Sequence, residues 1–338
     1  MNRYHITFAA LSLASAALLS AGFLFPHCGG FALIGLVPLL WMDRIASENR
    51  VRHFWWWHYL TFVLWNAFTT FWVCNATVAG GIGAILANAL QMSVIWSIFR
   101  LSKKRFKGTL PYIFLAAMWI TWERFYFDAE ISWPWLTLGN AFAFSHSCVQ
   151  WYEVTGPLGG SLWVWACNLS IFGLISTMVD GKWQKWNKKA RTAAIASTTF
   201  LFLGPLTASW IRYATFEEDK SCGSLDVCLL QPNLDPYQKF QSMSQAQQNE
   251  VLTDLMERNL ADSTSTSTSP LLFLAPETAT NDIVLNEMWN SPTVITLKSA
   301  LGRRDNCGIL FGASTYEFIH RESAPSYTAR RYGDGIWY

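Results

Sequence analysis

The sequence contains little charge for its length. Asp, Glu, Lys and Arg make up 14% of the 338 residues, whereas hydrophobic residues make up 51% and aromatic residues 16%. Soluble domains carry roughly 25% charged residues, so a large part of this chain is expected to lie outside water. The formal net charge is only +2. No global field would therefore attract nucleic acid, and we expect no nucleic-acid partner.

Several familiar catalytic and metal-binding motifs are absent. The chain has no GxSxG, HExxH or P-loop motif, and its seven cysteines form no CxxC pair. These absences argue against common serine-hydrolase, zinc-protease and nucleotide-binding sites, and they predict no metal, no cofactor and no disulfide framework. Gly80, Gly81 and Gly83 open an apolar segment and lack the strand–turn–helix context of a nucleotide site.

Long apolar segments fill the first two thirds of the chain. Each is near the roughly 20 residues that cross a bilayer, although the second is short. The first could alternatively be a cleaved signal peptide, because Arg3 precedes it and small residues follow it. We predict a membrane domain over residues 1–211 with about seven transmembrane helices, near residues 6–24, 30–42, 55–75, 82–100, 110–127, 160–179 and 191–211.

The basic residues alternate between the connections of these segments. The positive-inside rule places Lys- and Arg-rich connections in the cytoplasm, so residue 212 onward is predicted to lie outside it. Residues 128–159 mix aromatics, Pro and Gly and are expected to lie at the interface, and Glu123 is expected to pair with Arg124. The predicted inside connections contain Arg44, Arg50 and Arg52, then Arg100, Lys103, Lys104, Arg105 and Lys107, then Lys182, Lys185, Lys188, Lys189 and Arg191.

Residues 212–338 have the mixed composition of a globular domain. Strands are predicted at 225–231, 271–275 and 307–315, and a hairpin-like pair is predicted from SYTARRY and GIWY. Ser244 and Gln247 form a capping box before one helix, and Pro292 begins another. Strands and helices therefore alternate, which predicts an α/β domain.

Glu277 is the candidate catalytic residue. It follows a proline at the end of the apolar run in Leu271–Ala279, LLFLAPETA. A carboxylate at the mouth of a buried strand is held in place by the strand, and partial burial can adjust its pKa for general-base work. A buried carboxylate with a purely structural role is the alternative.

Several segments together resemble the bacterial apolipoprotein N-acyltransferases. In the apolar half they are GLVPLLW, SWPWLTLGN and QWYEVTGPLGGSLWVWACN, and in the second half LDVCLLQPNLDPYQKF, LLFLAPETA and GILFGAST. The similarity covers essentially the whole chain in the family's order. It implies a polytopic membrane domain followed by a nitrilase-like α-β-β-α domain outside the cytoplasmic membrane, of which residues 212–338 are the N-terminal part.

The resemblance also implies a reaction. A Glu-Lys-Cys triad passes an acyl chain from a phospholipid, through a Cys thioester, to the N-terminal diacylglyceryl-cysteine of a lipoprotein. Glu277 matches the base of this triad. The implied partners are a phospholipid acyl donor, a diacylated lipoprotein acceptor and the bilayer of the bacterial inner membrane, with the protein a monomer.

The chain departs from the family pattern at several positions. The family's Lys and Cys follow the region where this sequence stops, so the sequence is expected to be a truncated and inactive form. Cys307 lacks the family's following acidic context and is not expected to be the nucleophile, and Lys298 is expected on a helix surface. Ala275 stands where the family often has Trp, and Gln231-Pro232-Asn233 stands where many members have Gln-Gly-Asn.

Two other functions fit the same residues. A membrane-bound amidase of the nitrilase superfamily would share the triad and end in hydrolysis. A non-catalytic membrane protein that binds lipid or lipoprotein would not need Glu277. A transporter is disfavoured, because the predicted spanning segments hold almost no central ionisable residues of the kind that ion pathways use.

Overall fold

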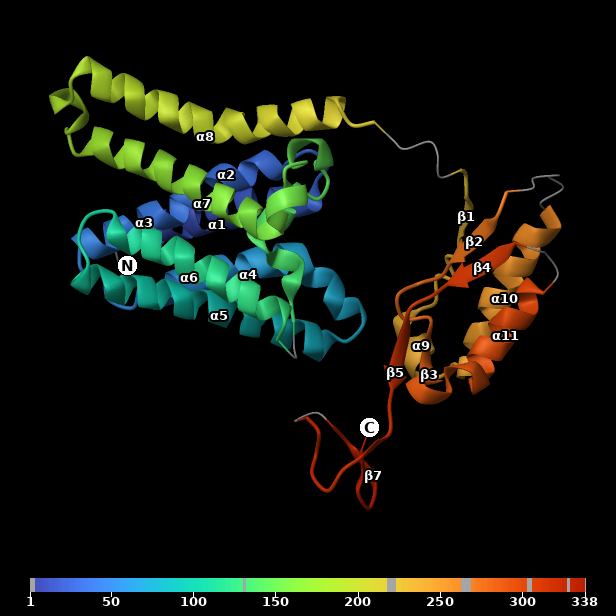
Figure 1. Ribbon diagram of the computed structural model, residues 1–338. Helices are drawn as coiled ribbons and strands as arrows, with labels where there is room; N and C mark the ends of the chain where they lie inside the picture. The colour runs from blue at the N-terminus through green and yellow to red at the C-terminus, as the bar shows by residue number, and fades with distance from the viewer. Residues whose placement is uncertain are drawn as a thin grey trace. The chain divides into compact units, whose positions relative to one another are not determined.

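The protein consists of two compact units, Met1–Glu217 and Glu218–Tyr338. The structure, a computed structural model, describes residues 4–129, 132–217, 223–262, 269–302, 306–326 and 329–337. The first unit is helical, and the second combines helices with short strands (Figure 1). The predicted class, a helical membrane domain followed by a smaller α/β region, is confirmed.

Each predicted spanning segment contains helix. Among the described residues, five stretches are long and apolar enough to cross a membrane, namely α1 (His5–Leu24), Gly29–Glu48, α5 (Val78–Arg105), α7 (Tyr152–Val179) and α8 (Lys188–Ala214). The Gly29–Glu48 stretch is divided among a 3-10 turn (Gly29–Phe31), α2 (Ala32–Gly35) and α3 (Val37–Glu48). The remaining two segments form the shorter α4 (Trp55–Thr70), which continues into 3-10 helix η2 (Phe71–Asn75), and α6 (Leu110–Phe127).

The core of the first unit lies between these helices. Its largest fully buried side chains include four tryptophans, Trp65, Trp96, Trp119 and Trp165, contributed by α4, α5, α6 and α7. Phe8 of α1 is also fully buried in this core. Because α1 packs against α4 and completes the core, the structure favours a retained helix over a cleaved signal peptide.

The segment between α6 and α7 contains no long helix in its described part. It forms the 3-10 helices η3 (Pro134–Leu136), η4 (Leu138–Phe142) and η5 (His146–Cys148). It leads into α7, which is kinked at Gly156 with φ 63°, directly before Pro157. Irregular backbone of this kind needs polar partners, because a lipid-exposed peptide group has no water to bind.

Glu123 supplies one of these partners, and the predicted Glu123–Arg124 ion pair is wrong. Glu123 is 2% exposed, and its Oε1 accepts hydrogen bonds from Trp119 Nε1 at 3.0 Å and from the Leu138 amide at 2.9 Å. Arg124 pairs instead with Asp128, four residues further along. Neighbouring residues on a helix point in different directions, which explains why the two do not meet.

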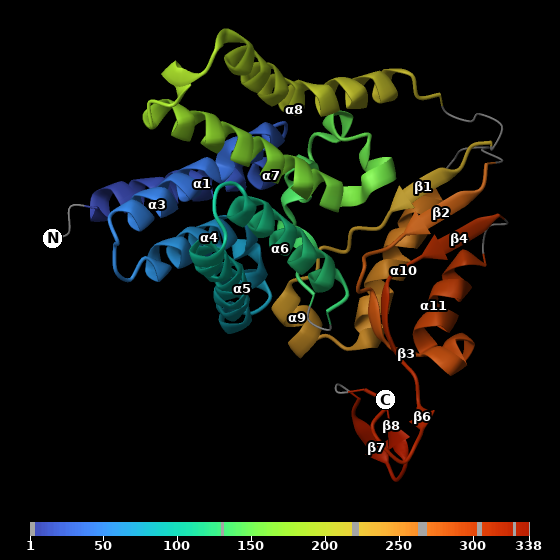
Figure 2. The ribbon, with the colours of Figure 1, turned by 60° about the vertical axis from the view of Figure 1, so that its left-hand side comes forward.

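The second unit is built on a three-stranded parallel sheet. The strand order is β1 (Asp226–Leu229), β2 (Leu271–Leu274), β4 (Cys307–Leu310). Helices α10 (Gln245–Asp262) and α11 (Pro292–Leu301) lie side by side against the sheet (Figure 2). The predicted strand–helix–strand–helix–strand alternation is confirmed. So is the capping box, in which the Ser244 amide donates to Gln247 Oε1 at 2.9 Å.

The helices cover one face of this sheet. Phe273 and Leu271 of β2 pack with Leu252 and Met256 of α10 and Leu297 of α11. The register pairs Leu229 with Leu274 and Leu274 with Leu310, so these three leucines share the opposite face. On that face Leu229 is 74% exposed and Leu310 is 63% exposed. The second unit thus presents an open apolar sheet face.

Smaller pairings complete the unit. The predicted strand at 307–315 is interrupted at Phe311 and Gly312, and β5 (Ala313–Tyr316) then pairs in parallel with β3 (Thr280–Val284). β6 (Ile319–His320), β8 (Ile336–Trp337) and β7 (Arg331–Gly333) form an antiparallel sheet in that order. The β7–β8 pair is the hairpin-like element predicted from SYTARRY and GIWY.

Candidate functional site

Glu277 lies where the central strand of the parallel sheet ends. The strand β2 stops at Leu274, and Ala275 extends the ladder by donating its amide to the Leu310 carbonyl at 2.9 Å. Glu277 then occupies a turn before β3. Ligands of open parallel sheets bind at the carboxyl ends of the strands, because the loops that follow them meet there. Glu277 is therefore placed where a substrate site is expected.

The Glu277 side chain is exposed. Among the residues that the structure describes, none forms a hydrogen bond or an ion pair with its carboxylate. The alternative interpretation, a buried carboxylate with a structural role, is therefore wrong. The carboxylate is available to accept a proton from a group placed next to it.

Gly312 fixes the backbone of this turn from the neighbouring strand. Its amide donates to the Pro276 carbonyl at 3.1 Å, and its carbonyl accepts the Ala279 amide at 2.9 Å. A Cβ at position 312 would lie 1.6 Å from the Glu277 carbonyl oxygen, a distance at which the atoms would overlap. Only glycine, which has no side chain, allows this close approach. Gly312 belongs to the GILFGAST segment, so two of the sequence motifs meet here.

The loop after β1 contacts the same turn. Asn233 has φ 49°, and Asp235 then caps α9 (Pro236–Gln241) by accepting the Tyr237 amide at 2.9 Å. This places Lys239, whose Nζ donates a hydrogen bond to the Thr278 carbonyl. Burial lowers the pKa of the Lys239 amine below its ordinary value. Gln231-Pro232-Asn233 thus leads into a helix that holds the Glu277 turn.

Helix α10 provides a further contact. Gln245 Nε2 donates to the Ala279 carbonyl at 3.2 Å and to Asn249 Oδ1 at 2.8 Å. Asn249, which is 4% exposed, donates in turn to Thr293 Oγ1 at 2.8 Å. Thr293 completes the chain by donating to Asp282 Oδ2 at 3.0 Å. A satisfied buried network of this kind holds α10, α11 and β3 in one arrangement.

Sequence reasoning missed Lys239, Gln245 and Gly312 as residues that support the site. Lys239 could have been recognised from the sequence, because it is the only lysine in the LDVCLLQPNLDPYQKF motif. Gly312 could have been recognised as well, because a glycine that interrupts an apolar strand often marks a close backbone approach. Gln245 could not, because a glutamine in the first turn of a helix is common.

Cys307 and Lys298 lie away from Glu277, as expected. Cys307 begins β4 and pairs with Leu271, whereas Glu277 follows the other end of β2. The four-residue strand separates the two ends by roughly 10 Å at 3.3 Å per residue. Lys298 is exposed on α11, with Nζ 5.7 Å from the ring centre of Trp289. In the described part of the chain no three His, Cys, Asp or Glu side chains gather as metal ligands would.

The motifs of the membrane half also meet. Asn168 of α7 is fully buried; its Oδ1 accepts the Leu36 amide at 2.7 Å, and its Nδ2 donates to the Ala32 carbonyl at 2.8 Å. Tyr152 donates its hydroxyl to the Gly139 carbonyl at 2.9 Å. These bonds join GLVPLLW, SWPWLTLGN and QWYEVTGPLGGSLWVWACN. Their polar and small residues act in packing within the first unit.

Two comparisons relate the chain to known proteins. Residues 15–170 match the model of the apolipoprotein N-acyltransferase N-terminal domain. An apolipoprotein N-acyltransferase from Chlorobaculum tepidum is 27% identical over 217 residues, which cover 64% of this chain and 39% of that relative. The chain thus spans well under half of the relative's length. The membrane unit is thus similar to the N-terminal domain of the apolipoprotein N-acyltransferases.

Proposed function

We propose that this chain contains the membrane domain and the first part of the nitrilase-like domain of an apolipoprotein N-acyltransferase, with Glu277 as the general base. The proposed domains are residues 1–211 and 212–338. One observation carries the proposal. The loop after β1, the Pro276–Glu277 turn after β2 and Gly312 after β4 converge at the carboxyl edge of one parallel sheet.

The proposed reaction has two acyl-transfer steps. Glu277 accepts the proton of a cysteine thiol, and the thiolate attacks an ester carbonyl of a phospholipid. The tetrahedral intermediate, whose oxyanion a lysine stabilises, releases the lysophospholipid alkoxide, which takes up a proton, and leaves a thioester. The α-amino group of a diacylglyceryl-cysteine then attacks the thioester, loses a proton and regenerates the thiol.

The geometry of Glu277 supports this assignment. Its backbone is held by Gly312 from β4, while Lys239 of α9 holds the adjacent Thr278 carbonyl. Its carboxylate is exposed and has no partner among the described residues. A general base needs both properties, because its position must be fixed while its oxygen atoms stay available for a proton. Lys239 lies at this turn but donates to the Thr278 carbonyl, and among the described residues no group bonds to the Glu277 carboxylate, so we propose that these residues alone give no turnover.

The open apolar face of the β1–β2–β4 sheet supports the proposed fold. Leu229 and Leu310 are exposed there, although both are large apolar side chains. In an α-β-β-α sandwich, two sheets pack face to face and their helices cover the outer sides. This face would therefore receive the second sheet of the sandwich.

The proposed setting is the bacterial inner membrane. The basic residues predict that residue 212 onward lies on its outer side, where the lipoprotein acceptor would be met. The phospholipid donor would come from the bilayer. We propose a monomer, in which one chain contributes the membrane domain and the catalytic domain.

The test is product analysis with the whole gene product that includes these residues. The purified protein is incubated with phospholipid vesicles and a synthetic diacylated lipopeptide, and the products are identified by mass spectrometry. The proposal predicts a triacylated lipopeptide and a lysophospholipid in equal amounts. Cleavage of an amide bond of the lipopeptide, with no triacylated lipopeptide formed, would instead identify an amidase. Lipid binding with no product would identify a binding protein.

A further inference from the structure

The first unit contains an amphipathic cleft at its basic end. The cleft has a volume of about 820 Å³ and lies between α3, the start of α6 and the last turns of α7. Its polar end is lined by Arg44, Glu48, Asp180 and Lys182, and its apolar wall includes Ile113 and Phe172. Small-molecule sites have volumes of roughly 300–1,000 Å³. The size therefore suits a lipid headgroup together with the beginning of its acyl chains.

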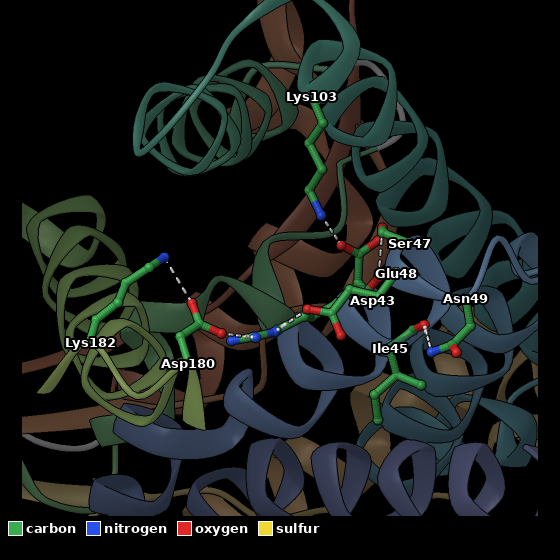
Figure 3. Close-up of polar contacts among 9 residues, drawn as sticks. Asp43, Ile45, Ser47, Glu48, Asn49, Lys103, Asp180 and Lys182 are labelled. Atoms are coloured by element: carbon green, nitrogen blue, oxygen red, sulfur yellow. Dashed lines mark hydrogen bonds and ion pairs between the residues drawn. The ribbon is translucent and has the colours of Figure 1, made fainter. Parts of the chain in front are cut away.

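The charged groups at the polar end alternate in sign. Arg44 Nε donates to Glu48 Oε1 at 2.7 Å, and a second guanidinium nitrogen donates to Asp180. Lys182 Nζ lies 3.0 Å from the other oxygen of Asp180 (Figure 3). The order is carboxylate, guanidinium, carboxylate, ammonium, so the lining has two positive and two negative charges. Neither a purely anionic nor a purely cationic ligand would match this alternation.

The framework behind Arg44 is held in place. Asp43, the preceding residue, is 1% exposed and binds Arg100 Nη1 at 3.1 Å. It also binds Lys103 of α5 (Figure 3). Arg44 also lies 5.0 Å from the ring centre of Trp41. A guanidinium has five N–H donors, and the two bonds to carboxylates leave others free to face the cleft. Arg44 is thus a pre-positioned donor.

We infer that this cleft binds a zwitterionic phospholipid with an ammonium headgroup, of the phosphatidylethanolamine class. The phosphate would contact Arg44 and Lys182, and the ammonium would contact Glu48 and Asp180. The acyl chains would extend along Ile113 and Phe172 toward the hydrocarbon. The sequence predicts that this end of the unit faces the cytoplasm, so the lipid would come from the inner leaflet. This binding is independent of the proposed acyl transfer.

Two substitutions test the inference without disturbing the core. Gly173 lines the cleft, and a Cβ there would meet no atom within 4 Å, so Gly173→Leu fills the cleft rather than breaking the helix. Gly83→Leu is the matched control, because Gly83 also has free space but lies outside the cleft lining. Lys182→Glu reverses one charge of the cleft. Lys189→Glu makes the same change at an exposed position outside the lining.

The measurement is native mass spectrometry of residues 1–338 in detergent, with equimolar phosphatidylethanolamine and phosphatidylglycerol. The wild type should retain phosphatidylethanolamine in preference to phosphatidylglycerol by about tenfold, as expected for one matched charge-assisted contact. Gly173→Leu should lose that preference, because it blocks both lipids. Lys182→Glu should increase it, because the change removes a phosphate contact that both lipids share and adds a charge that repels phosphatidylglycerol more strongly. Both controls should keep the wild-type preference at unchanged melting temperature. Equal retention of the two lipids by the wild type would overturn the inference. So would an equal change of preference in Lys189→Glu, which would indicate a general effect of surface charge.

Discussion

Gly312 and Glu277 are in direct backbone contact at the end of the parallel sheet. The Gly312 amide donates to the carbonyl of Pro276 at 3.1 Å, and a Cβ at 312 would lie 1.6 Å from the Glu277 carbonyl oxygen. The two residues are 35 positions apart in the sequence and belong to different motifs, and the β2–β4 pairing brings them together. The geometry of the candidate base therefore depends on a residue with no side chain.

Gly312→Ala should destabilise the second unit. The added methyl group must displace the Pro276–Glu277 backbone, and overpacking of this kind costs about 1–3 kcal/mol. Chemical denaturation followed by circular dichroism measures the change. Gly308→Ala is the matched control in β4, the strand just before Gly312, because its Cβ would lie at an ordinary 3.6 Å from Leu272 Cδ1. Equal stability of the two variants would contradict the close approach.

Lys239→Met should loosen the Glu277 turn, because it removes the donor to the Thr278 carbonyl. Amide hydrogen exchange of residues 275–280 should become faster. Lys298→Met, which alters an exposed lysine on α11, should leave that exchange unchanged. Protection of the turn that is the same in both variants would mean that Lys239 does not hold it.

Lys239 should also make a pH-dependent contribution to stability. Burial lowers its pKa in the folded protein below the 10.5 of an ordinary lysine. Between the folded and unfolded pKa values the unfolded chain binds more protons, so stability gains as the pH rises through that interval. The free energy of unfolding of the wild type minus that of Lys239→Met should therefore increase as the pH rises toward 10.5. A difference that stays constant with pH would contradict the lowered pKa of Lys239.

Asn168→Ala should destabilise the membrane unit. The change leaves the Leu36 amide and the Ala32 carbonyl without their buried partner. Each buried group left unsatisfied costs about 1–3 kcal/mol. Thermal unfolding in detergent measures the loss, with Ser197→Ala as the control, because Ser197 is exposed and bonds only within its own helix. A melting temperature for Asn168→Ala equal to that of the control would show that the Asn168 hydrogen bonds do not stabilise the membrane unit.

The sequence allowed much of this fold to be predicted, for local physical reasons. Apolar length identified the segments that form the long helices of the first unit, and the Ser244–Gln247 capping box and Pro292 marked the starts of α10 and α11. The α/β alternation and the position of Glu277 after β2 followed from strand periodicity. These features depend on short stretches of sequence, so they can be predicted from a single sequence.

The partners of these residues could not be predicted in the same way. Glu123 bonds to the Leu138 amide, 15 positions away, rather than to the adjacent Arg124. Gln245, Lys239 and Gly312 reach the Glu277 turn through three different elements. Such contacts depend on how helices and strands pack, so a local pattern can mark a residue such as Lys239 or Gly312 but does not identify its partner.

The proposed general base is tested most directly by the rate of N-acyl transfer. In the whole gene product, Glu277→Gln keeps the size of the side chain and removes its ability to accept the thiol proton. Glu287→Gln is the control, because Glu287 is an exposed acid ten residues further along the same unit. The rate is measured by mass spectrometry of a diacylated lipopeptide with phospholipid vesicles, after circular dichroism has shown both variants folded. We expect Glu277→Gln to be slower by about 10²–10⁴-fold, the contribution of a general base, and Glu287→Gln to match the wild type. A wild-type rate in Glu277→Gln would contradict the assignment of Glu277 as the base.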